Sequence, residues 1–242
     1  MNNRNIQGMI FAAGLGTRFK PWTDKHPKAL ATVNGKTLLQ RNIEYLLQYD
    51  IFNVVVNVHH FSQQIIEALE NNKGWGSTIT ISDETDEVLE TGGGLKKAAP
   101  LFSAETIVII NADILTDLDL GKMIAYHHQQ QSLATLATTN RQTSRYFLFN
   151  HDQALCGWRN TKTGEEKISR PAPKYFQKAF SGIHIIDKKI LPLIHRTGKF
   201  SMVDVYLDLA RTDTILSFDH SGSKFIDVGK PESVVTAEAM FK

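Results

Sequence analysis

The chain has 242 residues, and its 27 Lys and Arg nearly balance its 25 Asp and Glu, which leaves a net charge of only +2. This length is enough for one α/β domain with a buried core. So small a net charge provides no overall field that attracts anions, and no basic run is interleaved with aromatic residues, so nucleic acid is disfavoured as a partner. The single cysteine, Cys156, excludes an intramolecular disulfide framework.

The apolar runs are short, and the first residues are polar. Because the longest apolar runs have the length of a strand, neither a membrane span nor a membrane partner is expected. Residues 1–7 lack the apolar stretch of a signal peptide. We therefore expect a cytoplasmic protein, present as a monomer or a small homo-oligomer.

In the first half of the chain, short β-rich runs alternate with amphipathic stretches. Runs dense in Val and Ile predict strands, covered on both faces, at residues 9–13, 54–58, 79–82 and 107–111. Apolar residues at helical spacing predict helices around 38–47 and 65–69. This alternation predicts an α/β fold with a Rossmann-like, doubly wound, mostly parallel mixed sheet. Ligands of such sheets bind beyond the carboxyl ends of the strands.

The pattern changes after about residue 140. Two short apolar runs, 146–149 and 155–158, flank a turn and predict a hairpin, and a polar stretch with two prolines follows. Further on, a strand is expected at 179–186, a helix at 202–211 and a strand at 214–218. We expect residues 1–242 to form a single domain, in which the segment of about 141–178 is a small insertion lining one wall of a cleft.

The first predicted strand leads into Gly14-Leu15-Gly16-Thr17-Arg18, and Lys28 follows behind a proline. Glycines let backbone N–H groups approach an anion closely, and Arg18 and Lys28 add positive charge. The spacing is not that of a P-loop, and Phe19 stands where the dinucleotide-binding fingerprint has its third glycine. The loop therefore predicts a polyphosphate site of another kind, although each cation alone would also fit an ordinary solvated surface charge.

Two carboxylates follow apolar runs. Asp113 comes just after the strand predicted at 107–111, so it should lie over the same sheet edge as the glycine loop. Carboxylates combined with phosphate oxygens suit Mg²⁺, whereas the alternative for Asp113 is a helix N-cap. Asp227 ends a second apolar run, and its alternative is an Asp-Gly turn. Together the two are candidate metal ligands.

A second glycine-rich turn is predicted at Glu90-Thr91-Gly92-Gly93-Gly94, before a helix over 95–99. Three consecutive glycines have a high entropic cost unless something must approach the backbone closely. A flat base packed against the main chain would satisfy that requirement, and the alternative is a flexible surface turn.

Other chemically distinctive residues carry less information. The adjacent histidines 59–60 and 127–128 point to different sides of an element and have no partners at zinc-like spacing, so we expect structural or solvent-facing roles. Cys156 is expected to be inert packing. Trp158 could stack on a sugar or a base, or belong to the core.

The segment Gly14-Leu15-Gly16-Thr17-Arg18, followed by Pro27-Lys28-Ala29-Leu30, resembles the signature of the sugar-1-phosphate nucleotidyltransferases. The resemblance runs from Met9 to about Phe241 and includes Ser181-Gly182 and Ile226-Asp227-Val228-Gly229. Leu89-Glu90-Thr91-Gly92-Gly93-Gly94 is most similar to the branch that contains N-acetylmuramate-1-phosphate uridylyltransferase. The resemblance implies the GT-A-like nucleotide-diphospho-sugar transferase fold, with residues 141–178 on the sugar side of the cleft.

The resemblance also implies an activity. A nucleoside triphosphate, expected to be UTP, and a sugar 1-phosphate, such as N-acetylmuramate 1-phosphate, would give a nucleotide sugar for the cell wall and pyrophosphate, with Mg²⁺ as cofactor. A phosphate monoester has a second pKa near ~6, so the attacking phosphate needs no general base. This agrees with a sequence that shows no Ser-His-Asp or Cys-His arrangement.

The resemblance implies roles for individual residues. Arg18 would assist the leaving pyrophosphate, Lys28 would bridge the two reacting phosphates, and Asp113 would complete the catalytic set. Asp113 and Asp227 would bind the metal. The nucleotide-binding candidates are Ala13, Gly14, Gly16, Thr17, Arg18, Glu90, Gly92, Gly93 and Asn111. The sugar-binding candidates are Lys28, Ser181, Gly182, Trp158 and Lys167.

Two departures from the family pattern leave the sugar open. Ala112 replaces the more usual glycine, which changes little, but Glu166-Lys167 is followed by Ile168 instead of the proline of the larger relatives. Guanylyl transfer to mannose or heptose 1-phosphate and cytidylyl transfer to phosphocholine are the alternatives with the same chemistry. A further alternative is a non-catalytic nucleotide-sugar sensor, but a sensor has no need of Arg18, Lys28, Asp113 and Asp227 together.

Overall fold

The computed structural model describes residues 5–242, so part of the polar N-terminal segment considered above, residues 1–4, lies outside the described residues. The strands are β1 (Ile6–Phe11), β2 (Thr32–Val33), β3 (Lys36–Thr37), β4 (Asn53–Val58), β5 (Thr78–Asp83), β6 (Thr106–Asn111), β7 (Ile114–Thr116), β8 (Ala134–Thr139), β9 (Arg145–Phe149), β10 (Leu155–Asn160), β11 (Glu166–Ile168), β12 (Phe176–Asp187), β13 (Ile215–Asp219) and β14 (Phe225–Asp227). The helices are α1 (Leu38–Leu47), α2 (Ser62–Asn71), α3 (Glu90–Ala98), α4 (Leu120–Gln130), α5 (Met202–Leu209) and α6 (Glu232–Met240).

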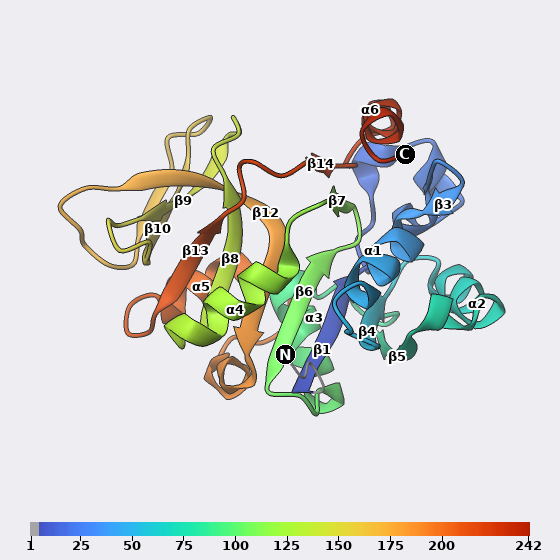
Figure 1. Cartoon of the computed structure of the whole chain (residues 1–242), viewed down its shortest axis with the longest axis horizontal. Coiled ribbons are helices and arrows are strands. Elements are labelled where there is room, and N and C mark those ends of the chain that lie inside the picture. The colour runs from blue at the N-terminus through green and yellow to red at the C-terminus, as the bar shows by residue number, and fades with distance from the viewer. Residues whose placement is uncertain (1–4) are drawn as a thin grey trace.

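A mixed sheet forms the centre of the molecule (Figure 1). β1 pairs in parallel with β4 and β6, and β5 pairs in parallel with β4 at the edge. β12 is antiparallel to both β6 and β8, and β13 is parallel to β8. The carboxyl ends of β1, β4 and β6 therefore lie at one edge of the sheet, where parallel α/β sheets bind their ligands.

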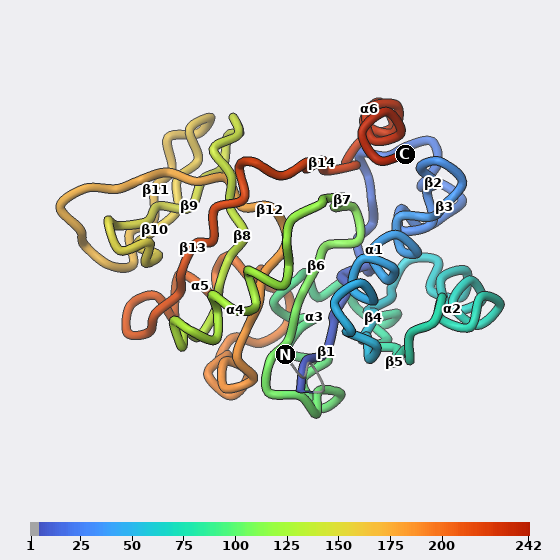
Figure 2. The backbone as a smooth tube through the Cα atoms, viewed as in Figure 1, coloured from blue at the N-terminus to red at the C-terminus, as the bar shows by residue number. Residues whose placement is uncertain are grey.

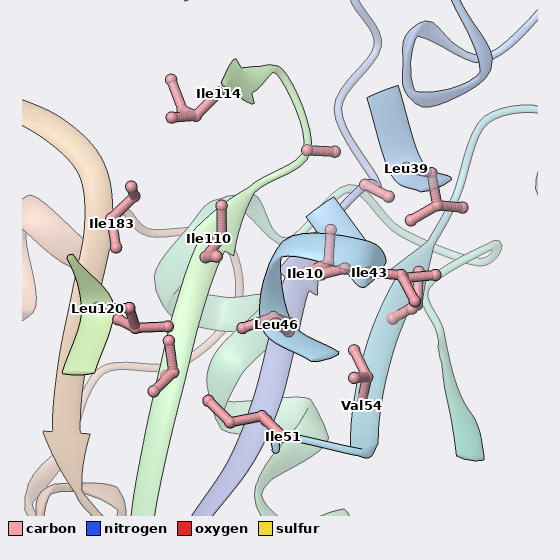
Figure 3. Close-up of a cluster of buried hydrophobic side chains, with 14 of the residues drawn as sticks. Ile10, Leu39, Ile43, Leu46, Ile51, Val54, Ile110, Ile114, Leu120 and Ile183 are labelled. Carbon is pink, nitrogen blue, oxygen red and sulfur yellow. The ribbon is translucent and has the colours of Figure 1, made fainter. Parts of the chain in front are cut away.

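Helices cover both faces of the sheet because the central strands are apolar on both sides. On one face, α1 packs its buried Leu39, Ile43 and Leu46 against Ile10 of β1 and Ile110 of β6 (Figure 3). α4 lies on the same face through Leu120, Met123 and Ile124. The other face of β1, with Met9 and Phe11, packs against α3 and α5. Successive β1 side chains thus enter two separate cores, as alternation along a strand requires.

The segment predicted as an insertion continues the sheet. The hairpin of β9 and β10 forms as expected, and β11 adds a third strand, while the first residues of β12 pair with β9. β12 then changes register between Phe180 and His184, where Gly182 has a φ of +71°. This irregularity lets one long strand serve both the β9–β11 extension and the central sheet.

The last part of the chain crosses between the two halves of the molecule (Figure 2). After β13, the chain runs through β14, which forms a two-stranded antiparallel ribbon with β7, to α6. Buried Val228 and Ala237 join a small third core with Phe19, Val33 and Leu115. This crossing brings residues near position 227 to the sheet edge that carries the end of β6.

The predicted α/β class and mostly parallel doubly wound sheet are confirmed, and helix α1 matches its predicted span. The prediction of a glycine-rich turn at 90–94 was wrong, because these residues form the first turns of α3. Several elements were not predicted from the sequence, among them β8, α4, α6 and the ribbon of β7 and β14. Within residues 5–242, no helix is long and apolar enough to cross a membrane.

Two buried histidines lie away from the sheet edge. His127 of α4 is 3% exposed and its Nδ1 lies 2.9 Å from the Thr135 hydroxyl oxygen. His184 of β12 is 1% exposed and hydrogen-bonds the Tyr206 hydroxyl. Burial lowers the pKa of His127 to about 4 and that of His184 to about 3. Both side chains are therefore neutral structural groups at physiological pH.

These histidines predict acid destabilisation. Because their pKa values in the folded state lie below the unfolded value of about 6.5, the unfolded state binds more protons as the pH falls below that value. Each histidine should therefore lower the free energy of unfolding by up to about 1.4 kcal/mol per pH unit on acidification toward its folded pKa. Urea unfolding between pH 7.5 and 5 should show a smaller fall for His127→Gln than for the wild type.

The control is His151→Gln, since the His151 side chain is 95% exposed. That variant should keep the wild-type pH dependence. Equal pH dependence in His127→Gln and the wild type would contradict the prediction.

Candidate active site

A cleft of about 530 Å³ opens at the carboxyl ends of β1, β4 and β6. The sequence candidates among its lining residues are Ala13, Gly14, Gly16, Thr17, Arg18, Lys28, Glu90, Asn111 and Asp113. Residues that the sequence analysis did not single out also line it, including Asn57, Glu84 and Lys199. The fold therefore brings together residues far apart in sequence at the edge where a ligand was expected.

The glycine loop presents unused backbone donors to the cleft. Within residues 5–242, the amides of Gly14, Leu15 and Gly16 make no hydrogen bond to another residue. A Cβ placed on Gly14 would meet no protein atom within 4 Å, so the space beside this backbone is open. Free N–H groups beside open space suit close approach by an anion.

Gly16 has a different role from Gly14. Its φ is +59°, and a Cβ there would lie 2.9 Å from Thr23 Cγ2 and 3.1 Å from Lys28 Cβ. The Gly16 carbonyl accepts hydrogen bonds from the Phe19 amide at 2.7 Å and the Thr23 hydroxyl at 3.0 Å. Gly16 therefore turns the loop back toward Lys28, in a conformation that other residues rarely adopt.

The two predicted cations lie on this loop in different environments. Lys28 donates to Asp113 Oδ2 at 2.5 Å, and both side chains are mostly buried. The Arg18 side chain is exposed and, within the described chain, has no hydrogen bond or ion pair. Lys28 is thus held at the floor of the cleft by a carboxylate, and Arg18 has all its donors free for a ligand.

The loop that carries Asp113 is fixed from two sides. The Ala112 amide donates to the Phe11 carbonyl at 3.0 Å, and the buried Asn42 side chain donates to the Ala112 carbonyl at 3.0 Å. The Asp113 carbonyl accepts from the Val228 amide at 2.8 Å. These bonds fix the backbone on both sides of the Asp113 carboxylate and tie it to the C-terminal crossing segment.

Asp227 comes to the same place through the ribbon of β7 and β14, where it pairs with Ile114, the neighbour of Asp113. Partial desolvation, and then repulsion by Asp113, raise the pKa of Asp227, while Lys28, Arg18 and Arg141 oppose this rise. No hydrogen bond or ion pair engages its carboxylate within residues 5–242. The two predicted carboxylates therefore lie close enough for the charge of Asp113 to raise the pKa of Asp227.

The donor chemistry fits a magnesium ion. The described chain brings no three His, Cys, Asp or Glu side chains together as a closed metal site. Mg²⁺ needs no such cage, because it keeps several waters and is held by one or two carboxylates together with phosphate oxygens. Two adjacent carboxylates beside an anion-accepting loop are an arrangement of this kind.

The glycines of α3 meet protein rather than open space. A Cβ on Gly92 would lie 2.5 Å from the Phe200 ring, and one on Gly93 would lie 2.5 Å from the Gly198 carbonyl oxygen. The Gly92 and Gly93 amides both donate to the Phe200 carbonyl, at 2.9 and 3.2 Å. Neither residue lines the cleft. The segment 198–200 thus fills the space that side chains on these two glycines would need.

Glu90 and Thr91, at the start of α3, do line the cleft. The Thr91 hydroxyl oxygen accepts from the Met202 amide at 2.9 Å, and Lys199 Nζ lies 3.7 Å from Glu90 Oε1. The segment 198–202 is thus fastened along the first turn of α3. It adds the cation of Lys199 to this wall of the cleft.

Lys28 lines the cleft, and the other four sugar-side candidates lie outside the lining in two groups. Ser181 is 1% exposed and its hydroxyl oxygen lies 2.7 Å from His220 Nε2. Gly182 leaves room for Asn111, since a Cβ there would lie 2.8 Å from Asn111 Nδ2. Lys167 of β11 lies 5.7 Å above the Trp158 ring and 3.9 Å from Asp204. Trp158 packs against the second core.

Arg141 is a cation near Asp227 that the sequence analysis missed. Its Nη2 donates to the Phe180 carbonyl at 2.9 Å, and its guanidinium lies 5.3 Å from the centre of the Phe225 ring. Arg141 begins the segment predicted as an insertion. No local motif marks this arginine, because its closeness to Asp227 arises only through the chain crossing at β14.

Residues 7–242 match the model of the nucleotidyl transferase family, and the chain belongs to that family. The chain is 30% identical over 241 residues to the N-acetylmuramate alpha-1-phosphate uridylyltransferase of Caulobacter vibrioides, covering 96% of this chain and 95% of the relative. It is 25% identical to the mannose-1-phosphate guanyltransferase of Yarrowia lipolytica over 98% of this chain, which spans only 64% of that relative's length.

Among solved structures, HddC from Yersinia pseudotuberculosis, complexed with GMP-PN, is similar with a TM-score of 0.77 and 26% identity. The match covers 98% of this chain and 99% of that chain. The predicted family and its nucleotide-diphospho-sugar transferase fold are thereby confirmed.

The two loop glycines predict opposite effects on stability. Gly16→Ala should lower the free energy of unfolding by at least about 1 kcal/mol, because alanine is strained at positive φ and its Cβ meets Thr23 and Lys28. Gly14→Ala should leave it unchanged or raise it by up to about 1 kcal/mol, because the added Cβ enters open space. Urea unfolding of both variants without ligand tests this. Equal destabilisation by the two substitutions would contradict the assignment.

Proposed function

We propose that this protein transfers a nucleotidyl group from a nucleoside triphosphate to the phosphate of a sugar 1-phosphate. An oxygen of the sugar phosphate forms a bond to the α-phosphorus, the bond from that phosphorus to the β-phosphate oxygen breaks, and pyrophosphate leaves. One observation carries the proposal: Lys28 and Asp113 line the cleft beside the glycine loop, and the pairing of β14 with β7 brings Asp227 next to Asp113. Membership of the family supports the same chemistry.

Two anions must come together in this reaction, so charge neutralisation and alignment are the main catalytic tasks. The free amides of residues 14–16 would bind the triphosphate, and Arg18 would stabilise the leaving pyrophosphate. Lys28 would lie between the α-phosphate and the attacking phosphate. Asp113 and Asp227 would hold Mg²⁺, which when bound supplies charge neutralisation at the phosphate oxygens.

The attacking group needs no protein base. A phosphate monoester is mostly dianionic at neutral pH, since its second pKa is about 6. Asp113 is paired with Lys28 and so serves to hold charge in place rather than to remove a proton. The cleft's chemistry is therefore that of binding and orientation.

For the substrates, we propose UTP and an amino-sugar 1-phosphate such as N-acetylmuramate 1-phosphate. The relative from Caulobacter vibrioides, which matches along nearly the whole of both chains, supports this choice. Guanylyl transfer to a hexose or heptose 1-phosphate is the second candidate, favoured by the likeness to the guanyltransferase and to HddC complexed with GMP-PN. Glu90 and Thr91 would face the nucleoside in either case.

The test is pyrophosphate release, with each of four nucleoside triphosphates against a panel of sugar 1-phosphates and phosphocholine, in the presence of Mg²⁺. We expect the highest kcat/KM for UTP with N-acetylmuramate 1-phosphate. A preference for GTP would establish the second candidate instead. Release with no pair would refute the enzyme, and nucleotide-sugar binding without turnover would indicate a sensor.

Asp113→Asn should lower kcat by at least about 100-fold, because it removes the negative charge that pairs with Lys28 and would bind the metal. Asn keeps the size of the side chain, so the fold should persist by circular dichroism. Asp86→Asn is the control, since Asp86 is exposed on the loop after β5 and does not itself line the cleft. Activity of Asp113→Asn near the wild-type value would place the metal elsewhere.

Arg141→Ala should raise KM for the sugar 1-phosphate by about tenfold or more, through loss of a charge-assisted contact, and change KM for the triphosphate much less. Arg145→Ala is a matched control, because Arg145, like Arg141, is exposed and outside the cleft lining, but it does not act on Asp227 within the described chain. Steady-state kinetics with each substrate varied in turn separates the two. If both variants behave alike, Arg141 has no part in binding the sugar phosphate.

A further inference from the structure

On the side of β4, the end of β1 is held by a side chain. The pairing of β1 with β4 ends at Phe11 and Asn57. Beyond it, the amides of Ala12 and Ala13 both donate to the side-chain oxygen of Asn57, at 2.7 and 3.3 Å. Asn57 is only 2% exposed. Its oxygen therefore sets the path of the two residues that lead directly into the glycine loop.

This contact requires one of two orientations of the Asn57 amide. In the opposite orientation the NH₂ group would face the two backbone N–H groups, and no hydrogen bond would form. Glu84 selects the productive orientation, because its Oε1 accepts from Asn57 Nδ2 at 2.7 Å. A carboxylate has only acceptors, so it cannot stabilise the reversed amide.

Glu84 links this contact to the other wall of the cleft. Burial raises the pKa of its carboxyl group, and the interactions with Asn57 and with the Leu89 amide, directly before α3, oppose this rise. Its backbone is held at both ends, since its amide donates to the Val58 carbonyl at 2.8 Å and its carbonyl lies 2.6 Å from His59 Nδ1. Glu84 is 1% exposed, so the pair is shielded from competing water.

The third glycine of α3 provides the space for this pair. A Cβ on Gly94 would lie 2.6 Å from Glu84 Oε1 and 3.0 Å from Asn57 Nδ2. Real Cβ atoms essentially never approach as closely as 2.6 Å, and a displaced Glu84 would lose the geometry of its hydrogen bond with Asn57. The lack of a side chain at Gly94 therefore makes room for the buried pair of Asn57 and Glu84, whereas Gly92 and Gly93 make room for the segment 198–200.

We propose that Asn57 and Glu84 are positioning residues for triphosphate binding: from the wall of the cleft they fix the glycine loop and join it to the start of α3. Neither needs to touch the phosphates, and the effect requires a group at position 84 that accepts from Asn57 and also presents an oxygen to the Leu89 amide. This inference rests on the proposed function, in which the glycine loop binds the triphosphate.

The sharpest test exchanges the amide at position 57 and the carboxylate at position 84. Glu84→Gln leaves one acceptor for two donors, so either the Asn57 or the Leu89 contact is lost. The double variant Asn57→Asp with Glu84→Gln restores every contact. Its new carboxylate accepts from the Ala12 and Ala13 amides and from the Gln NH₂ group, while the Gln oxygen accepts from Leu89. The double variant also keeps the total charge of the pair.

The affinity for UTP and for GTP is measured by titration calorimetry with Mg²⁺ present, which needs no turnover. Glu84→Gln should weaken binding of the nucleotide that the wild type prefers by about tenfold, and the double variant should recover at least half of this loss on a logarithmic scale. KM for the sugar 1-phosphate should change less than twofold in both. Asp83→Asn, the same change on the adjacent exposed carboxylate of β5, should bind like the wild type.

Thermal unfolding identifies variants that fail to fold. If Glu84→Gln does not fold, near wild-type affinity in the folded double variant still supports the proposal. Unchanged affinity in a folded Glu84→Gln, or a double variant as weak as the single one, would overturn it. If the wild type binds neither triphosphate, the proposed function fails instead, so the two failures are distinguishable.

Discussion

The backbone hydrogen bond between Val228 and Asp113 is the contact on which the site depends. It holds the C-terminal crossing segment against the end of β6 and so places Asp227 close to Asp113. Two like charges at close range repel each other and raise the pKa of Asp227. The pairing of β7 with β14 and the small third core hold the backbone in place against this repulsion. Such stored repulsion is expected where a cation binds.

The surroundings of the carboxylates show how the charge is balanced. Lys28 pairs with Asp113 and also acts on Asp227, while Arg18 and Arg141 act on Asp227 without forming an ion pair with it in the described chain. The three cations come from the glycine loop and from the segment that follows β8. In the proposed reaction these groups would neutralise two incoming phosphates, so the cations would be shared between protein and ligand instead of being committed to surface ion pairs.

The glycines divide into distinct physical roles. Gly14 leaves space open to the cleft, and Gly16 adopts a positive φ against Lys28. The glycines of α3 instead admit other parts of the protein, namely the segment 198–200 and the Asn57–Glu84 pair. A sequence shows that a Cβ is excluded at each position, but it does not show whether a ligand or a neighbouring side chain excludes it. This is why the turn predicted at 90–94 was wrong.

The sequence by itself determined the sheet class, the span of α1, the glycine loop and the two candidate carboxylates, because these depend on local apolar periodicity and on residue chemistry at strand ends. The tertiary structure decided which of these residues meet. Asn57 and Glu84 carry no local signal, since strand pairing brings them to the cleft. The same holds for Arg141, which the crossing of β14 brings near Asp227. Trp158 and Lys167 were chosen as sugar-side candidates for their chemistry alone, and pairing between β10 and β11 places them together on the sheet extension outside the cleft lining.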